Sequence, residues 1–495
     1  MMYGEEKSDS LIVAANLANN PQGAESVERR SGAKGNAEQP HMRRTQSRES
    51  MSQRLSRVRE AAKQRKKERF TALFHLLTAE ALENAFLSLS RKAAAGVDGV
   101  RWKDYAENLK VNIADLHRRL HQGSYRAQPG RRHYIPKADG KQRPLGIASL
   151  EDKIVQYALV KILNAVYEND FMGFSYGFRP GRSQHNALDA LATGLGRTNV
   201  NWVLDADISQ FFDKVSHEWL IRFIEHRIGD QRVIRLIRKW LTAGTSEEGE
   251  WRASEEGTPQ GAVISPLLAN IYLHYVFDLW AHQWRRRHAT GNVVMVRYAD
   301  DIVIGFDKRI DAQCFRIAMQ RRLKEFGLTV HPEKTRLMEF GRFAAENRAS
   351  RGKGKPETFN FLGFTHISGK DRSGRFMLIR KTRRDRMTAT LKAIKDGLRK
   401  RWHYSIPEQG KWLRRVVQGY LNYHSVPGNY PMMRKFRIYV TDLWRRALRR
   451  RSQQDDTTWT KANRLAAVWL PKVRVLHPWP VERFTARHPR QEPGA

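Results

Sequence analysis

The stretch "VMVRYADDIVIGF", residues 294–306, sets two adjacent aspartates between two apolar runs. Apolar side chains alternate with their neighbours on both sides of the pair, and a period of two predicts two β-strands. We therefore expect a tight hairpin with Ala299, Asp300 and Asp301 at its tip. The turn preference of aspartate alone would explain an isolated pair, but like charges at the end of a buried hairpin repel unless something neutralises them.

A second apolar run, "WVLDADISQFFDKV" at 202–215, also leads into acids, namely Asp205, Asp207 and Asp213. Carboxylates gathered at strand ends favour a bound cation, and Mg²⁺ takes one or two protein carboxylates together with substrate phosphates. A pair of such ions can clamp the attacking and leaving oxygens of an in-line phosphoryl transfer. These residues alone leave nucleotidyl transfer and nuclease chemistry both open.

The overall charge indicates a polyanionic partner. The 495 residues carry 89 Lys and Arg against 51 Asp and Glu, a formal charge of +38. Nucleic acid is the favoured partner and an anionic membrane surface the alternative. No apolar window reaches the roughly 20 residues of a membrane span, and the single cysteine, Cys314, argues against a disulfide framework or a cysteine zinc site. We expect an intracellular protein of a reducing cytosol.

The chain divides by composition. Residues 1–66 are polar and basic and predict a disordered arm. From about 131 to 365, helical patterns alternate with short β-rich runs, which predicts an α+β fold. Beyond about 370 the strands are expected to stop and arginine-rich helices to follow. The expected strands are "RRHYIPK", "NWVLDADIS", the opening stretch and "FNFLGFTH".

An ordered series of motifs resembles the group II intron-encoded reverse transcriptase/maturases. "YADD" (298–301) looks like the Y-x-D-D box of reverse transcriptases, and "WLRRVVQGYLNYHSVPGNYPMMRKF" (412–436) resembles the maturase, or X, domain. The remaining blocks are "YIPKADGKQRPLGIASLEDKIVQ" (134–156), "SYGFRPGRSQHNAL" (175–188), "LDADISQFFDKVSH" (204–217), "GTPQGAVISPLLANIYLHYVFD" (257–278), "GLTVHPEKTRL" (327–337) and "FNFLGF" (359–364).

The resemblance implies a right-hand polymerase of fingers, palm and thumb, with an antiparallel palm sheet. It places the reverse transcriptase fingers and palm at 67–370, a helical maturase (X)/thumb domain at 371–452 and a basic nucleic-acid-binding tail at 453–495. Many relatives end in a cysteine-bearing HNH endonuclease. Since no cysteine follows residue 314, we expect a bacterial-type member without that domain.

The resemblance also implies a catalytic site. The family's metal-binding carboxylates match Asp207, Asp300 and Asp301, with Asp207 and Asp300 expected to bridge two Mg²⁺ ions and Asp301 less directly involved. Mn²⁺ is the expected substitute ion.

A nucleotide pocket is implied by the same motifs. Phe212 falls where the family places an aromatic gate against a ribose 2′-OH, and Gln260 where it lines the pocket. Arg143 is suited to hold the triphosphate, because a guanidinium forks onto phosphate oxygens; Lys141 is a weaker candidate, and Lys334 is expected near the primer terminus. The alternatives are core packing for Phe212 and a solvated surface role for the cations.

Two arginine-rich helices are expected to bind RNA and the template–primer. So many like charges at i, i+3 and i+4 destabilise a free helix, and a phosphate backbone would reverse that penalty. The expected contacts are Arg414, Arg415, Arg445, Arg446, Arg449 and Arg450.

The sequence therefore predicts an RNA-directed DNA polymerase that binds group II intron RNA, assists its splicing and copies it into DNA during retrohoming. Its expected partners are intron RNA, a DNA target, template–primer and deoxynucleoside triphosphates, without a membrane, in the bacterial cytosol; a homodimer is left open. The rival hypotheses are a domesticated or defence-associated reverse transcriptase, a splicing-only RNA-binding maturase, and an enzyme that copies RNA into RNA, which Phe212 disfavours.

Overall fold

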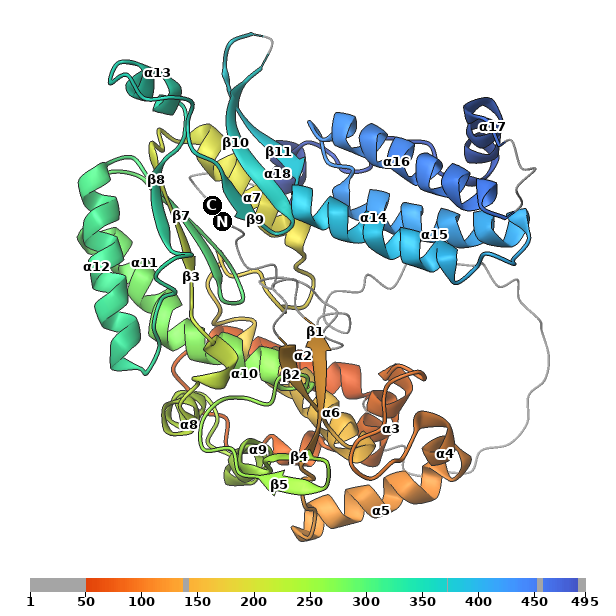
Figure 1. Cartoon of the computed structure of the whole chain (residues 1–495). Helices are drawn as coiled ribbons and strands as arrows, with labels where there is room; N and C mark the ends of the chain where they lie inside the picture. The colour runs from red at the N-terminus through yellow and green to blue at the C-terminus, as the bar shows by residue number, and fades with distance from the viewer. Residues whose placement is uncertain (1–49, 137–141, 372, 452–456, 488–495) are drawn as a thin grey trace, which may run out of the picture.

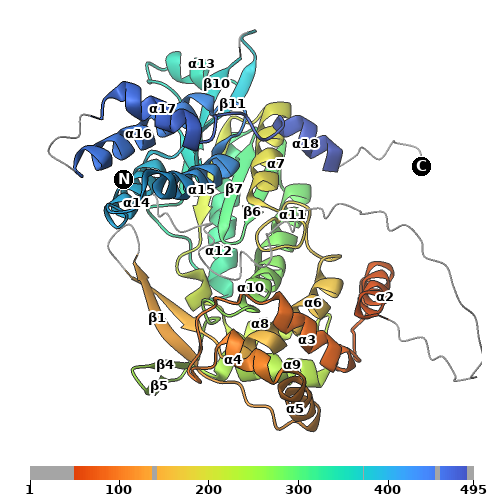
Figure 2. The ribbon, with the colours of Figure 1, turned by 90° about the vertical axis from the view of Figure 1, so that its right-hand side faces the viewer.

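The computed structural model describes residues 50–136, 142–371, 373–451 and 457–487. These residues form a mixed helix and sheet structure with three sheets and a separate group of C-terminal helices (Figure 1). Seen from a direction 90° away, the C-terminal helices α14–α17 again lie at one end of the molecule and helix α5 at the other (Figure 2).

The described chain begins with helix α2, Met51–Gln64, inside the segment expected to be disordered. Ser50 caps it, and the capping box with Gln53 satisfies the first amides. Met51, Leu55 and Val58 pack against the main hydrophobic core. The expectation of a disordered arm is therefore wrong from residue 50 onward, since this helix has an apolar face to bury; residues 1–49 lie outside the described residues.

A helical lobe and a small sheet follow. The sheet has the order β2-β1-β4-β5, with β1 and β4 parallel and the other pairs antiparallel. The elements are the 3₁₀ turn η1 (Phe74–Leu76), α3 (Ala79–Ser88), α4 (Trp102–Glu107), α5 (Leu109–Gln122), β1 (Gly130–Pro136), β2 (Gln142–Ile147), α6 (Leu150–Tyr167), α8 (His217–Glu225), α9 (Gln231–Thr242), β4 (Thr245–Glu247) and β5 (Glu250–Arg252).

The central sheet is wholly antiparallel, in the order β6-β7-β3-β8. Its strands and flanking elements are α7 (Gln184–Arg197), β3 (Trp202–Asp207), the 3₁₀ turn η2 (Phe211–Asp213), α10 (Ser265–Leu273), the π-helical segment η3 (His274–Asp278), α11 (Leu279–Arg287), β6 (Val293–Tyr298), β7 (Asp301–Phe306), α12 (Arg309–Glu325) and β8 (Arg336–Glu339). The hairpin expected from the opening stretch is β6–β7, and its strands are buried throughout except at Val294.

Alternation along β3 and β7 divides the core between two faces. Leu204 and Ile304 pack with α10–α12 in one cluster, whereas Val203 and Val303 pack with α7 in another. Since successive side chains of a strand point to opposite faces, the central sheet is covered by helices on both sides (Figure 1). This double cover explains why β3, β6 and β7 are largely apolar, with Asp205 of β3 and Arg297 of β6 as buried polar exceptions.

The segment "FNFLGFTH" is two strands rather than the single strand expected. β9 (Phe359–Phe361) and β10 (Phe364–Lys370) pair antiparallel, and the turn between them is left-handed, with φ of +46° at Leu362 and +76° at Gly363. β11 (Phe376–Thr382) pairs with β10, so the strands extend past residue 370. The short helix α13 (Ala344–Ala349) lies in the loop before this sheet.

The C-terminal helices have a hydrophobic core of their own, which includes Leu413, Phe436 and Trp444. They are α14 (Arg384–Arg399), α15 (Ile406–His424), α16 (Tyr430–Arg449) and α17 (Trp459–Trp469), and we call them the C-terminal helical domain. A last helix, α18 (Pro480–Arg487), leaves this domain and packs against α7. Helices α17 and α18 thus lie within residues 453–495, the segment expected to be a basic nucleic-acid-binding tail.

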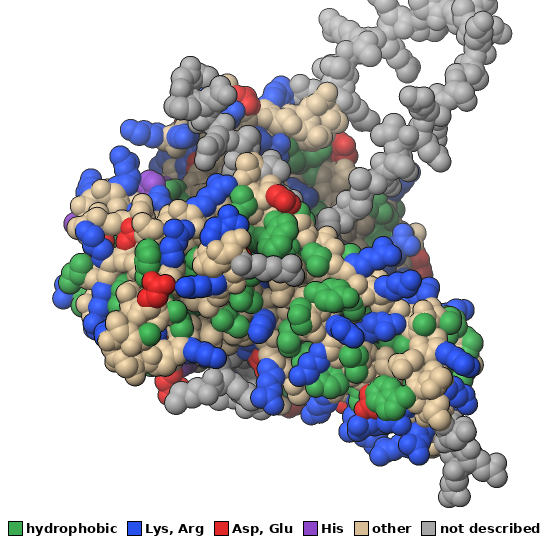
Figure 3. Space-filling view, turned by 90° about the horizontal axis from the view of Figure 1, so that it is seen from above, with side chains coloured by type: hydrophobic (Ala, Val, Ile, Leu, Met, Phe, Trp, Pro, Cys, Tyr) green, Lys and Arg blue, Asp and Glu red, His purple; other side chains and the backbone are tan. Residues whose placement is uncertain are grey.

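Lys and Arg side chains are spread over the face seen in Figure 3 among apolar and other polar groups, with fewer acids between them, in keeping with the net charge of +38. Among the residues that the structure describes, no helix combines the length and the apolar character needed to cross a membrane.

Candidate active site

The predicted carboxylates meet where the two inner strands of the central sheet, β3 and β7, end and begin. Asp207 is the last residue of β3 and Asp301 the first of β7, and their Cα atoms are directly paired across the two strands. Asp300 lies in the turn between β6 and β7, where Ala299 has a φ of +55°. Asp207 and Asp301 are buried and Asp300 is half-buried. The structure therefore brings together the three aspartates that were predicted as a set.

The buried Arg297 side chain hydrogen-bonds the backbone of the turn between β6 and β7. The Arg297 guanidinium donates to the Ala299 carbonyl at 2.9 Å, to both carboxylate oxygens of Asp278 at 2.7 and 2.6 Å, and to Asn270 Oδ1 at 3.1 Å. It also donates to Ser175 Oγ at 2.7 Å. These bonds tie the carboxylate turn to α10, to η3 and to the segment before α7.

The backbone at Gly177 approaches the same turn closely. A Cβ atom at this position would lie 2.2 Å from the Ala299 nitrogen, so only glycine fits. Asn270 Nδ2 donates to the Gly177 carbonyl at 2.7 Å. The "SYGFRP" motif therefore supports the turn through backbone proximity.

The "HPEKT" segment surrounds Asp207. The Asp207 carbonyl accepts from the His331 amide at 2.7 Å, and its amide donates to Thr335 Oγ1 at 3.4 Å. Lys334 Nζ lies 3.5 Å from Asp207 Oδ2. The cation predicted near the primer terminus thus contacts one of the three site carboxylates.

The "GTPQGA" loop joins the central sheet to the small sheet. On one side the Thr258 amide donates to the Phe212 carbonyl at 2.7 Å, and on the other the Gly146 amide of β2 donates to the Gln260 carbonyl at 2.7 Å. Gly257 and Gly261 have φ of +85° and +103°, which glycine adopts without a steric cost. The loop brings Phe212 and Gln260 together with the strand that carries Arg143.

The side chains of this pocket have defined neighbours. Gln260 Nε2 donates to Asp213 Oδ1 at 2.8 Å. Phe212 is half-buried and packs edge-on against the buried Phe211, with ring centroids 5.3 Å apart. Arg143 is half-buried and sits opposite Ile135 in the β1–β2 pair. Lys141, the weaker triphosphate candidate, lies outside the described residues.

The donor set suits a hard cation. Within the described ranges, no group of three or more His, Cys, Asp or Glu side chains is arranged as a complete protein-only metal site. Mg²⁺ does not require one, because it takes one or two carboxylates and completes its shell with water and substrate phosphates. Two strand-paired aspartates, Asp207 and Asp301, beside Asp300 provide such oxygens.

The predicted RNA-contacting arginines fall into two groups. Arg414 donates to the Val468 and Trp469 carbonyls, and Arg445 pairs with Asp442 and stacks on Trp459. Arg446 also pairs with Asp442. The exposed positions Arg415, Arg449 and Arg450 lie on α15 and at the end of α16. Some of these arginines thus already stabilise the helical domain.

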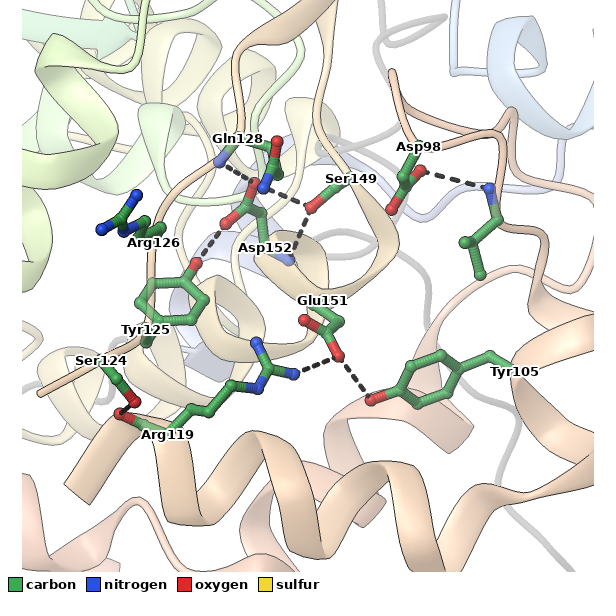
Figure 4. A pocket seen from close by; sticks show the side chains of 11 residues that line it. Asp98, Tyr105, Arg119, Ser124, Tyr125, Arg126, Gln128, Ser149, Glu151 and Asp152 are labelled. Carbon is green, nitrogen blue, oxygen red and sulfur yellow. Dashed lines mark hydrogen bonds and ion pairs between the residues drawn. The ribbon is translucent and has the colours of Figure 1, made fainter. Parts of the chain in front are cut away.

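A cavity of about 470 Å³ lies away from the carboxylates, between α4, α5 and the start of α6. Its acids are used internally: Glu151 accepts from Arg119 at 2.7 Å, and Asp152 accepts from Ser149 Oγ and the Gln128 amide at 2.8 and 3.0 Å (Figure 4). Burial raises the pKa of Asp152. These bonds join α5, α6 and the segment before β1. The acids that line the cavity therefore have structural partners within the protein.

The sequence did not predict the hydrogen bonds of Arg297 that hold the carboxylate turn in place. Arg297, Asp278 and Asn270 are polar residues inside otherwise apolar patterns, "VMVRY" and "PLLANIYLHYVFD". Such interruptions are a usable signal, because a buried charge needs a partner. The sequence does not reveal which residue that partner is.

Several known proteins share sequence with this chain. Residues 135–366 match the reverse transcriptase (RNA-dependent DNA polymerase) family. Protein YkfC of Escherichia coli is 44% identical over 206 residues, which are 41% of this chain and 54% of that protein. Group II intron-encoded protein LtrA of Lactococcus lactis is 38% identical over 223 residues, 44% of this chain and 37% of that protein.

A more distant relative carries maturase in its name. Nuclear intron maturase 2 of Arabidopsis thaliana is 29% identical over 110 residues, 21% of this chain and 15% of that protein. The chain thus spans about half, or less, of the length of these relatives. The match of residues 135–366 and these relatives confirm the predicted resemblance to group II intron-encoded reverse transcriptase/maturases.

Proposed function

We propose that this chain is an RNA-directed DNA polymerase that binds a group II intron RNA, assists its splicing and copies it into DNA. The observation that carries the proposal is the pairing of Asp207 with Asp301 across β3 and β7, beside a turn that Arg297 fixes. The match of residues 135–366 to reverse transcriptases supports the reaction, and the intron-encoded relative supports the RNA partner.

In this proposal the fold is a right hand. The central sheet is the palm, the small β2-β1-β4-β5 sheet with its helices forms the fingers, and the C-terminal helical domain is the thumb. The "GTPQGA" loop then lies where palm and fingers meet, since it is bonded to both. This placement is what a nucleotide pocket between two subdomains requires.

The carboxylates Asp207 and Asp300 would hold two Mg²⁺ ions, with Asp301 less directly involved. When bound, such ions neutralise the phosphates and stabilise the attacking and leaving oxygens. The chain's own residues keep the carboxylates in place: β-pairing fixes Asp207 against Asp301, and Arg297 fixes the turn. Lys334 beside Asp207 partly offsets the local negative charge.

The incoming nucleotide would be held by groups around the "GTPQGA" loop. Arg143 would fork onto the triphosphate, and Gln260, oriented by its bond to Asp213, would line the pocket. The Phe212 ring would occupy the space of a ribose 2′-OH and so favour deoxynucleotides. The loop's two backbone links keep this pocket's walls at a fixed spacing.

Splicing assistance needs no catalytic group of the protein, since the RNA can supply its own chemistry. The protein would stabilise the folded RNA by charge and shape. The exposed arginines Arg415, Arg449 and Arg450 on the helical domain are the proposed phosphate contacts.

The test is extension of a DNA primer on an RNA template with deoxynucleotides and Mg²⁺. Asp300→Asn should lower the rate at least about a hundredfold, because the metal contribution is worth several kcal/mol. Asp307→Asn is the matched control: Asp307 follows the far end of β7 and accepts from the Asn292 amide at 3.0 Å. A folded, RNA-binding wild type that extends no primer would favour the splicing-only maturase instead.

A further inference from the structure

Asp189 of α7 is a buried acid that the proposed reaction does not use. Its side chain is 1% exposed, and it pairs with two arginines from distant parts of the chain. Arg380 Nη1 lies 3.2 Å from Asp189 Oδ1, and Arg483 Nε bonds Asp189 Oδ2. A buried carboxylate between two guanidiniums is a strong and directional contact.

The two arginines flank the C-terminal helical domain in the sequence. Arg380 lies on β11, immediately before α14, and Arg483 lies on α18, after α17. The chain thus enters the domain beside Asp189 and returns to Asp189 after leaving it. Figures 1 and 2 both place α18 next to α7, away from α17.

The returning segment, residues 476–483, also bonds the end of α15. The Leu476 and His477 amides donate to the Ser425 carbonyl at 3.0 and 3.3 Å. His477 Nε2 lies 2.7 Å from the Asn422 carbonyl, so this nitrogen carries the hydrogen. We call residues 476–483 the strap.

The histidine of the strap links these contacts to Asp189. Arg483 Nη1 donates to His477 Nδ1 at 2.9 Å, which agrees with a hydrogen on the other ring nitrogen. The His477 ring stacks on His185 of α7, with centroids 4.0 Å apart. His185 Nε2 in turn bonds the Tyr423 carbonyl at 2.8 Å. One chain of bonds therefore joins α7, the strap and the end of α15.

We propose that Asp189 anchors both connections of the helical domain to the central-sheet domain, and that the strap's Arg483 is a positioning residue that keeps the primer–template duplex gripped between successive additions. The inference rests on the proposed polymerase function. The end of α15 contacts the central-sheet domain through Tyr423 and Val426, so without the strap the helical domain can pivot about these contacts and its entry at β11. The exit at Arg483 is a second, separate tie that restrains this pivot. Loss of the second tie should shorten the DNA made in one binding event and leave the addition of a single nucleotide unchanged.

Arg483→Met is the decisive variant, because Asp189 keeps Arg380 as a partner, so the fold should be retained. Arg474→Met removes the same charge from an exposed position just before the strap and is the matched control. Arg483→Lys keeps a positive charge at this position, so its product length should lie between those of Arg483→Met and the wild type. With heparin as a trap, Arg483→Met should make products at least about twofold shorter than the control, with single-nucleotide addition equal in both.

A second measurement does not depend on activity. Hydrogen exchange of the Leu476 and His477 amides reports whether the strap is docked on Ser425. Arg483→Met should exchange about tenfold faster there than Arg474→Met. Equal exchange rates in the two variants would contradict the proposal that Arg483 holds the strap in place, even if no primer is extended. Faster exchange in Arg483→Met with unchanged product length would contradict the proposed role of the strap in holding the primer–template duplex. A wild type that extends no primer, yet shows the exchange difference, contradicts the polymerase proposal and leaves the strap supported.

Discussion

Arg297 and Asp278 form a two-pronged ion pair in which both side chains are 0% exposed, with N···O distances of 2.7 and 2.6 Å. Asp278 ends the π-helical segment η3, whose wider turn separates α10 from α11. Such single π segments in longer helices are often found at functional sites. Here the segment ends at Asp278, the acid that neutralises Arg297 beside the carboxylate turn.

Breaking this pair should be costly. Asp278→Leu leaves a buried guanidinium without its counter-ion, and we expect a loss of about 3–5 kcal/mol in the free energy of unfolding. The double variant Arg297→Met/Asp278→Leu should be less destabilised than Asp278→Leu, because no uncompensated charge remains. Urea unfolding measures both. Additive losses in the double variant would contradict a direct pair.

Gly177 should not tolerate a methyl group. Gly177→Ala would force the Ala299 nitrogen to move, and we expect about 1–3 kcal/mol of strain together with slower primer extension. Gly173→Ala is the control four residues earlier, where an added Cβ meets nothing within 4 Å. Equal extension by the two variants would show that the turn does not depend on this contact.

Phe212→Val should admit ribonucleotides. Removing the ring leaves room for a 2′-OH, so the preference for deoxynucleotides should fall about tenfold or more. Phe211→Leu, at the buried neighbouring ring, should cost stability and leave the preference unchanged. If Phe212 is core packing alone, both variants will lose stability and neither will change nucleotide choice.

Arg449→Gln and Arg450→Gln should weaken RNA binding through the salt-dependent part of the affinity. For each phosphate that the variant no longer neutralises, the slope of log K against log salt should fall by about 0.7–0.9. Arg445→Gln, at a position paired with Asp442, should change the slope less. Filter binding over a salt series makes the comparison, and equal slopes in all three would remove α16 from the RNA surface.

The stability should fall with acidification, in part through His366. Burial lowers the pKa of His366 to about 3, against an ordinary value of 6.5. Below pH 6.5 His366 is protonated in the unfolded chain but stays neutral in the folded chain. The free energy of unfolding therefore decreases as the pH falls from 6.5 towards 3, by about 1.4 kcal/mol per pH unit. His366→Phe, which keeps a ring stacked on Phe359, should flatten this dependence by that amount in urea unfolding at about pH 6 and pH 5.

The central hairpin was predictable because its signal is local. Alternating apolar residues predicted β6 and β7, and a turn preference predicted Asp300 and Asp301 at the tip; in the structure Asp300 lies in the turn and Asp301 is the first residue of β7. β11 was missed because "FMLIRKT" follows an arginine-rich turn and gains its strand character from pairing with β10. α2 was missed although Met51, Leu55, Val58 and Ala62 follow helical spacing, because the polar composition around them dominated the interpretation.

The aspartates of the site were predictable as a set, but their support was not. The Arg297 guanidinium bonds Asp278 and Ser175, which are 19 and 122 residues away in the chain. Nothing local to residue 297 indicates those partners, because tertiary packing alone brings them together. The strap has the same origin, since Arg483 and Asp189 are 294 residues apart.

The C-terminal helices α14–α17 bury most of their apolar side chains among themselves, and Tyr423 and Val426, at the end of α15, join a cluster that holds the central sheet. Two bodies with independent cores can melt at different temperatures, and a single calorimetric peak is then not the natural outcome. The helical domain is accordingly a module whose interior, around Leu413 and Phe436, can be remodelled without repacking the side chains beneath the carboxylate turn, provided that Tyr423 and Val426 are kept.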